Sequence, residues 1–242
     1  MKINIHQFKR TFVAAAGCCA LSLIAAAPAH AALVSQLGIL DLTANGGINP
    51  ATGEAWKAGD KYHLIYVTTA TTAATSTDIA DYNAFVTADA ASQTGAFANM
   101  GDVTWTALGS TLSVNAIDNS PITGPVMAVF NSAAVATGSA DLWNFTWSDT
   151  NHIGRIDGTN SNVWTGSHTG GVADANDELG ATNGSTRRHW TGWTSWGPAD
   201  ANQANVDLLP MVGISEELMV IPEPSTAILL GFGSLALLRR RR

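Results

Sequence analysis

The strongest strand signal in the chain is YHLIYVT, residues 62–68. Aromatic and β-branched side chains dominate this segment, and residues of these types favour the pleated surface of a sheet. We therefore expect it to cross the centre of a sheet. Residues 33–42 form a shorter apolar stretch interrupted by polar residues and glycine, and they predict an edge strand followed by a loop.

A helix is predicted for residues 78–91, after a connection rich in threonine and alanine. Thr77 is placed to cap its N-terminus, and Asp78 and Asp81 lie near the positive end of its dipole. Its apolar residues recur at helical spacing: Ile79, Tyr82, Phe85, Val86 and Ala90.

Short apolar segments follow from residue 100 onward, at 103–110, 126–131 and 162–166, and long polar loops separate them. A strand, a helix and then short strands predict one compact α+β domain, residues 32–221. A chain of about 190 residues is long enough to bury one core.

The N-terminus predicts a secretory signal peptide, residues 1–31. Lys2, Lys9 and Arg10 precede an apolar run over residues 11–27. The small residues Ala29 and Ala31 then predict cleavage by signal peptidase after Ala31.

Both cysteines, Cys18 and Cys19, lie in this leader. A lipoprotein cut before Cys18 is the less favoured alternative, because the apolar run continues well past it. After cleavage at Ala31 the mature protein has neither disulfides, thiolate catalysis nor cysteine metal ligands. Packing alone must hold the body together.

The body is strongly acidic. Between residues 32 and 221, five basic residues stand against eighteen acidic ones, a formal net charge of −13. This charge argues against nucleic acid as a partner and leaves divalent cations as ligands to consider.

Oxygen ligands of the kind that calcium prefers cluster at Asp174, Asn176, Asp177 and Glu178. Leu179 stands where an EF-hand loop requires glycine, so a solvated acidic turn is the favoured interpretation and no cofactor is predicted. A similar polar loop contains Asp149, Asn151, Asp157 and Asn160.

The C-terminal residues 222–242 have three parts: Pro222, Glu223 and Pro224, an apolar run over 227–238, and Arg239, Arg240, Arg241 and Arg242. At about 1.5 Å per residue the apolar run covers roughly 18 Å of a hydrocarbon core about 30 Å thick, so it is a marginal membrane segment. The arginines are expected to stay on the cytoplasmic side as a membrane stop, with the body outside.

This tail resembles the PEP-CTERM sorting signal of Gram-negative bacteria, over residues 222–242 only. The resemblance implies that exosortase, a membrane transpeptidase-like enzyme, processes the protein near Pro222, Glu223 and Pro224 and passes it to the surface. The motif would then be a substrate site and not a catalytic one. An ordinary tail anchor is the alternative.

Short motifs of the body follow one another in a fixed order between residues 61 and 196. They are YHL at 62–64, DYNAF at 81–85, WTA at 105–107, GST at 109–111, GPV at 124–126, DLW at 141–143 and VWTGS at 163–167. Their order resembles the endostatin-type branch of the C-type-lectin-like fold. That branch's disulfides cannot form here, and the Glu-Pro-Asn and Trp-Asn-Asp triplets of sugar-binding members are missing, so the resemblance implies the fold and not sugar binding.

All eight tryptophans lie in the body, and most are expected in the core. Trp190, Trp193 and Trp196, among Gly, Ser and Thr, could stack on sugar rings as a glycan platform. A tryptophan-rich loop folded onto the core is the favoured alternative.

Catalytic motifs are missing from the sequence, and no enzyme activity is predicted. The histidines of the body, His63, His152, His168 and His189, are widely spaced. His63 lies in the apolar strand and is expected to be structural. A secreted hydrolase that uses two carboxylates stays open as an alternative.

Together these features predict an exported protein, anchored in the inner membrane as a precursor and then placed at the cell surface or in an extracellular matrix. A structural or adhesive role is expected, with extracellular polysaccharide as a partner. The alternative is a module that binds a glycan or, through the threonine-rich residues 68–77, ice.

Overall fold

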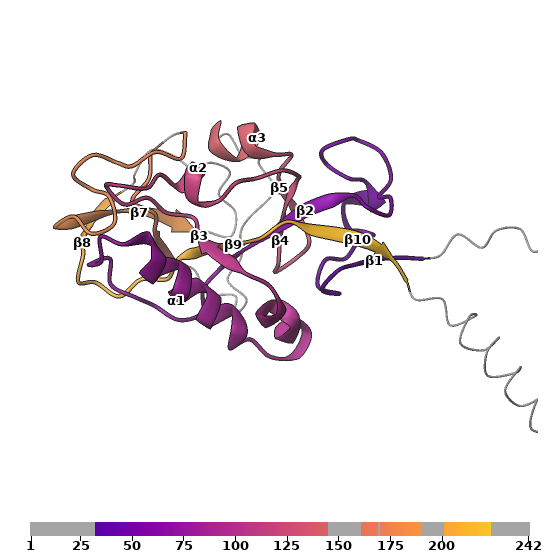
Figure 1. Ribbon diagram of the computed structural model, residues 1–242, viewed down its shortest axis with the longest axis horizontal. Helices are drawn as coiled ribbons and strands as arrows, with labels where there is room; N and C mark the ends of the chain where they lie inside the picture. The colour runs from indigo at the N-terminus through magenta and orange to yellow at the C-terminus, as the bar shows by residue number, and fades with distance from the viewer. Residues whose placement is uncertain (1–31, 145–160, 169, 190–200, 224–242) are drawn as a thin grey trace, which may run out of the picture. The chain divides into compact units, whose positions relative to one another are not determined.

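A computed structural model describes residues 32–144, 161–168, 170–189 and 201–223 (Figure 1). The chain separates into two units, Met1–His30 and Ala31–Arg242, and every described residue belongs to the second. The predicted signal peptide, with Ala29 and Ala31, lies outside the described residues.

Strand β2, Lys61–Val67, is the centre of the main sheet, as its sequence predicts. On one edge it pairs in parallel with β4, Val126–Ala128. On the other edge it pairs with β10, Leu218–Pro222, near its start and with β9, Val212–Ser215, near its end, both antiparallel. All its residues from Tyr62 to Val67 are buried.

The main sheet has seven strands in the order β1-β10-β2-β4-β5, with β9 joining β2 to β3. Its remaining strands are β1 (Leu33–Ser35), β3 (Trp105–Ala107) and β5 (Ala134–Ala136). A second, antiparallel sheet contains β6 (Ser161–Trp164), β7 (Asn183–His189) and β8 (Ala201–Ala204). Sheets and helices together confirm the predicted α+β class.

Helix α1, Ile79–Ala91, confirms the predicted helix. Its N-cap is Asp78 and not Thr77, because the Asp78 carboxylate accepts a hydrogen bond from the backbone N–H of Ala80 at 2.9 Å. Its buried apolar side chains are Tyr82, Val86 and Ala90. The shorter helices are η1 (Ala44–Gly47), η2 (Gly95–Asp102), α2 (Ala116–Asn119) and α3 (Ser139–Asn144).

The core lies on both faces of β2, because successive side chains of a strand point to opposite faces. Tyr62, Leu64 and Tyr66 belong to one buried cluster, and Ile65 and Val67 belong to another. The first cluster also contains the buried apolar residues of α1 and Met127 of β4, and the second contains Val126 and Ala128 of β4 with the buried residues of β5.

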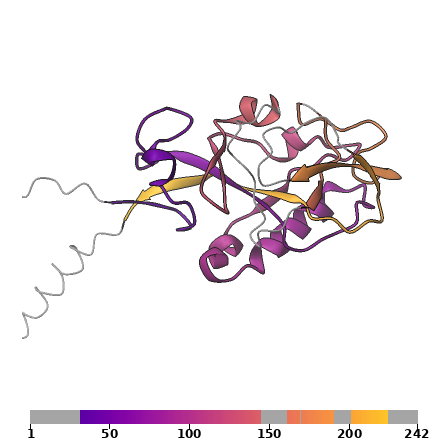
Figure 2. The same ribbon diagram turned by 180° about the vertical axis from the view of Figure 1, so that it is seen from behind.

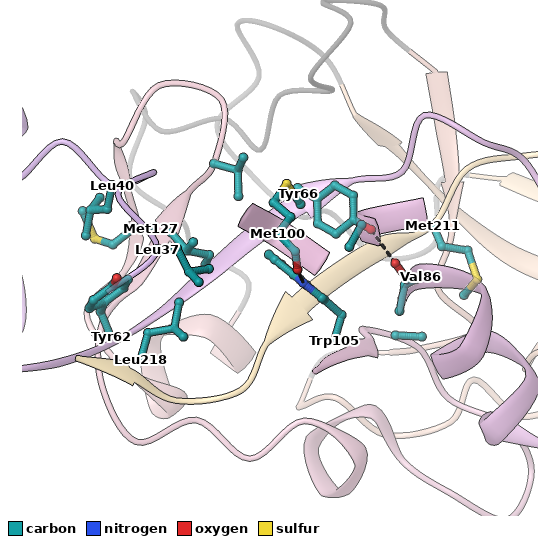
Figure 3. Packing of buried hydrophobic residues seen from close by; sticks show 14 of the residues in the cluster. Leu37, Leu40, Tyr62, Tyr66, Val86, Met100, Trp105, Met127, Met211 and Leu218 are labelled. Atoms are coloured by element: carbon teal, nitrogen blue, oxygen red, sulfur yellow. Dashed lines mark hydrogen bonds between the residues drawn. The ribbon is translucent and has the colours of Figure 1, made fainter. Parts of the chain in front are cut away.

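Two aromatic side chains at the middle of the first cluster are anchored by hydrogen bonds (Figure 3). The rings of Tyr66 and Trp105 meet edge to face, with centroids 4.8 Å apart. The Tyr66 hydroxyl donates to the carbonyl oxygen of Val86 at 2.7 Å, and the Trp105 indole N–H donates to that of Met100 at 2.8 Å. Packing of this kind stabilises the described part of the chain, which contains no cysteine.

Candidate functional site

The start of the sorting motif is part of the main sheet. Strand β10 ends at Pro222, and β1 pairs with it antiparallel, Leu33 opposite Pro222 and Val34 opposite Ile221. Beyond the strands, the backbone N–H of Glu223 donates to the carbonyl oxygen of Ala32 at 2.6 Å. The first residue after the predicted leader cut therefore lies beside the motif.

Burial along β10 changes toward its end. Leu218 and Val220 are buried, whereas Met219 between them is 44% exposed, which is the alternation of a strand that covers a core with one face. Pro222 and Glu223 are exposed. The motif thus begins where the strand leaves the core.

The residues after β1 fasten it to the same core. Leu37 and Leu40 are buried in the cluster that contains Tyr62 and Leu218 (Figure 3). Both views show β1 and β10 side by side, with residues 32 and 223 at the same end of the sheet (Figures 1 and 2). Antiparallel pairing requires this, because one strand begins where the other ends.

A pocket of about 310 Å³ lies at the junction of β9 and β10. Its lining combines one imidazole, several hydroxyls and two carboxylates: His63, Thr104, Thr106, Ser120, Thr123, Ser215, Glu216 and Glu217, with Pro121 and Ile214. This volume is near the lower limit of about 300 Å³ for small-molecule sites.

His63 is neutral and fully engaged within this pocket. Its Nδ1 lies 2.9 Å from the carbonyl oxygen of Ser215, which can only accept, so Nδ1 carries the proton. Nε2 then accepts from the backbone N–H of Thr123 at 3.2 Å. Burial lowers the pKa of His63, which favours the same neutral form. The geometry agrees with the structural role that the sequence predicts.

Thr123 and Glu217 continue this network, and sequence reasoning missed both. The Thr123 hydroxyl donates to the Glu217 carboxylate, whose other oxygen lies 2.7 Å from the Lys61 ammonium. Lys61 and Thr123 lower the pKa of the Glu217 carboxyl. Because its proton is already donated, the Thr123 hydroxyl is held as a structural link between the segment before β4 and the turn before β10.

The four calcium candidates are placed unequally. Asp174 and Glu178 are buried, Asp177 is half-buried and Asn176 is exposed. Asp174 Oδ1 lies 3.3 Å from Nε2 of His168. Among the described residues, no three His, Cys, Asp or Glu side chains come close enough to hold a metal ion. Calcium at this loop stays a prediction, and the loop with Asp149, Asn151, Asp157 and Asn160 lies outside the described residues.

Four tryptophans are buried, as expected for the core: Trp56, Trp105, Trp143 and Trp164. The candidate glycan platform, Trp190, Trp193 and Trp196, lies outside the described residues.

The threonine-rich connection is held from within. Thr68 is fully buried, and its hydroxyl donates to the carbonyl oxygen of Ala70 at 2.8 Å. The Thr69 hydroxyl donates to the buried Asp89 carboxylate at 2.9 Å, and that carboxylate also accepts from the Ala70 N–H at 2.7 Å. The Thr69 hydroxyl fixes the connection to α1, the Thr68 hydroxyl bonds within the connection, and neither is part of a regular exposed array.

Comparison with known families identifies a sorting signal at the C-terminus. The PEP-CTERM protein-sorting motif matches residues 220–242, two residues earlier than the predicted signal, so the match overlaps β10. No curated protein matches the chain. The motif indicates an exported protein that exosortase processes, with a membrane-anchored precursor that is later delivered to the surface.

The remainder of the sorting signal lies outside the described residues: Pro224, the apolar run 227–238, and Arg239, Arg240, Arg241 and Arg242. Within the described ranges we find no helix with the length and apolarity that a membrane crossing requires.

Proposed function

We propose that the protein is a structural or adhesive component of the cell surface or of an extracellular polysaccharide matrix, released to that place by exosortase. The observation that carries the proposal is the sorting motif joined directly to the last strand of a folded body. In the same export pathway, signal peptidase removes the leader after Ala31.

The body suits such a role because the polar side chains around its pocket are hydrogen-bonded to other groups of the protein. His63 is neutral and bonded on both nitrogens, and the Thr123 hydroxyl donates to Glu217. We propose for it a single domain of the C-type-lectin-like fold. Its acidic surface favours solubility after release.

A glycan-binding module is the second candidate, and the size of the pocket beside His63 favours it. The open surface of the pocket is mostly apolar, because its hydroxyls are bonded within the protein: Thr123 to Glu217, Thr106 to Ser120 and Ser215 to Glu216. A glycan array separates the two candidates, because a structural protein should bind no sugar selectively.

A secreted hydrolase is a further alternative. Its activity would be lost when one catalytic carboxylate, such as Glu216 or Glu217, is replaced by the amide.

Intact mass and cell fraction of the protein from its native host test the main proposal. We expect a mature protein that begins at Ala32, ends near residues 222–226, and is found in the surface or medium fraction. A host that lacks the sorting enzyme is the control and should retain the whole tail in the inner membrane.

A wild-type mass that still includes Arg242, in the inner-membrane fraction of the native host, would reject sorting. The protein would then be a membrane-tethered domain.

A further inference from the structure

Hydrogen bonding between β1 and β10 alternates along the pair, and two backbone bonds at its ends set its phase. Glu223 N–H donates to Ala32 O at 2.6 Å, and Gln36 N–H donates to Met219 O at 3.1 Å. Because bonded pairs recur every second residue in an antiparallel ladder, Val34 and Ile221 are the bonded pair between them.

Pro222 fits this phase. It lies opposite Leu33, at a pair whose N–H groups point away from the partner strand, so its missing N–H costs the ladder nothing. The motif therefore enters the sheet without breaking it.

The backbone of β10 is engaged on both edges. On the β2 side, Val220 N–H donates to Asp60 O at 2.9 Å and Val220 O accepts from Gly59 N–H at 2.8 Å. On the β1 side lie the bonds from residues 219, 221 and 223. A peptide bond held in this way is protected from cleavage until the segment opens locally.

Beyond Val220, which also bonds to Gly59 and Asp60, β1 is the described strand that pairs with β10. Strand β2 pairs with β10 at Leu218 and Met219, whereas β1 pairs with Val220, Ile221 and Pro222. Strand β1 is three residues long and lies at the edge of the sheet. Holding the motif thus depends on β1.

We propose that β1 is a clamp that positions the sorting motif, so that exosortase cuts only on the C-terminal side of Glu223. The clamp keeps the backbone of residues 219–223 paired and presents the exposed side chains of Pro222 and Glu223 at a fixed place. Val34 is its main positioning residue. This inference rests on the proposed processing by exosortase.

Proline at two neighbouring positions tests the clamp in the full chain, expressed in the native host. Val34→Pro removes the N–H of the bonded pair, whereas the Leu33 N–H points to the open edge and Leu33→Pro leaves the ladder intact. Val34→Ile is the conservative control. All three variants must begin at Ala32, which shows that the leader cut is unchanged.

Intact mass gives the position of the C-terminal cut. We expect products that end at or beyond Glu223 for wild type, Leu33→Pro and Val34→Ile, and additional products that end before Glu223 for Val34→Pro. Hydrogen exchange on precursors from a host without the sorting enzyme should show lost protection at Ile221 and Glu223 in Val34→Pro alone. Protection of Leu64 in β2 verifies that the body is still folded.

The outcomes separate the two proposals. A Val34→Pro product with the wild-type cut, despite lost protection at Ile221, would overturn the clamp while sorting stands. Unchanged protection at Ile221 would overturn it as well. A wild-type chain that keeps Arg242 in its native host would overturn processing, and the clamp's role with it.

Discussion

Strands β2 and β10 lie side by side in one sheet, yet they are built for different purposes. Every side chain of β2 from Tyr62 to Val67 is buried, and the core covers both of its faces. In β10, Leu218 and Val220 are buried, Met219 is half exposed and Pro222 is exposed. One strand holds the fold, whereas the other brings a processing site from the core to the surface.

The difference teaches how a sorting signal can be attached to a folded body. A motif on a long linker would be independent of the fold, but here its first residues are hydrogen-bonded and paired with Ala32 and the residues of β1. The central region should therefore respond to substitution with large losses of stability, and the clamp region mainly with altered processing.

Trp105→Ala in the central region should have the largest effect. Its fully buried indole packs on Tyr66 and donates to Met100, and loss of such a side chain costs about 3–5 kcal/mol. Urea unfolding of the mature protein measures the change. Leu112→Ala, at a side chain that is 78% exposed, is the control and should change the free energy of unfolding by no more than about 0.5 kcal/mol. Equal losses at both positions would contradict the comparison.

Gly213→Ala should have the next largest effect. A Cβ at Gly213 in β9 would lie 2.5 Å from Cε1 of Tyr66, so the ring must shift within a filled core. Overpacking of this kind costs about 1–3 kcal/mol. Gly138→Ala meets no atom within 4 Å and is the matched control in the same unfolding experiment. An unchanged stability of Gly213→Ala would mean that the core around Tyr66 is loosely packed.

The centre of this fold was predictable because its signals are local. The composition of residues 62–68 predicts a buried strand, and the spacing of Tyr82, Val86 and Ala90 predicts the buried side of α1. The cap was misplaced by one residue because Thr77 and Asp78 are both good caps, and only the structure shows which oxygen reaches the Ala80 N–H.

The clamp was not predictable from local signals. Residues 33–35 predict an edge strand, but their sequence does not indicate that residues 220–222 are the partner strand. Pairing between the two ends of the body depends on how every element between residues 35 and 220 folds. The apolar run Leu218–Ile221 just before the motif was the available signal, and it was not used. The link between Thr123 and Glu217 was missed for the same reason.

The smallest expected effect is the pH dependence of stability that His63 causes, where the central strand β2 meets the turn before β10. His63 belongs to β2, and its ring faces Ser215 at the end of β9 and Glu217 in the turn that follows. Burial lowers its pKa below the ordinary value of 6.5, so the unfolded chain binds a proton at a higher pH than the folded protein does. The free energy of unfolding should therefore fall as the pH drops through about 6.5, by at most about 1.4 kcal/mol per pH unit.

Urea midpoints are measured between about pH 7 and about pH 5.5, above the range in which ordinary carboxylates titrate, and the difference between wild type and His63→Gln removes the contribution of His152, His168 and His189. His63→Gln should be less stable at every pH, because its amide cannot reproduce both ring hydrogen bonds, but its midpoint should depend less on pH than that of the wild type. Glu217 does not produce the same trend in this window, since Lys61 and Thr123 lower the pKa of its carboxyl. Parallel curves for the two proteins would show that the pKa of His63 is the same in the folded and the unfolded protein. The ring would then be less isolated from water than its burial implies.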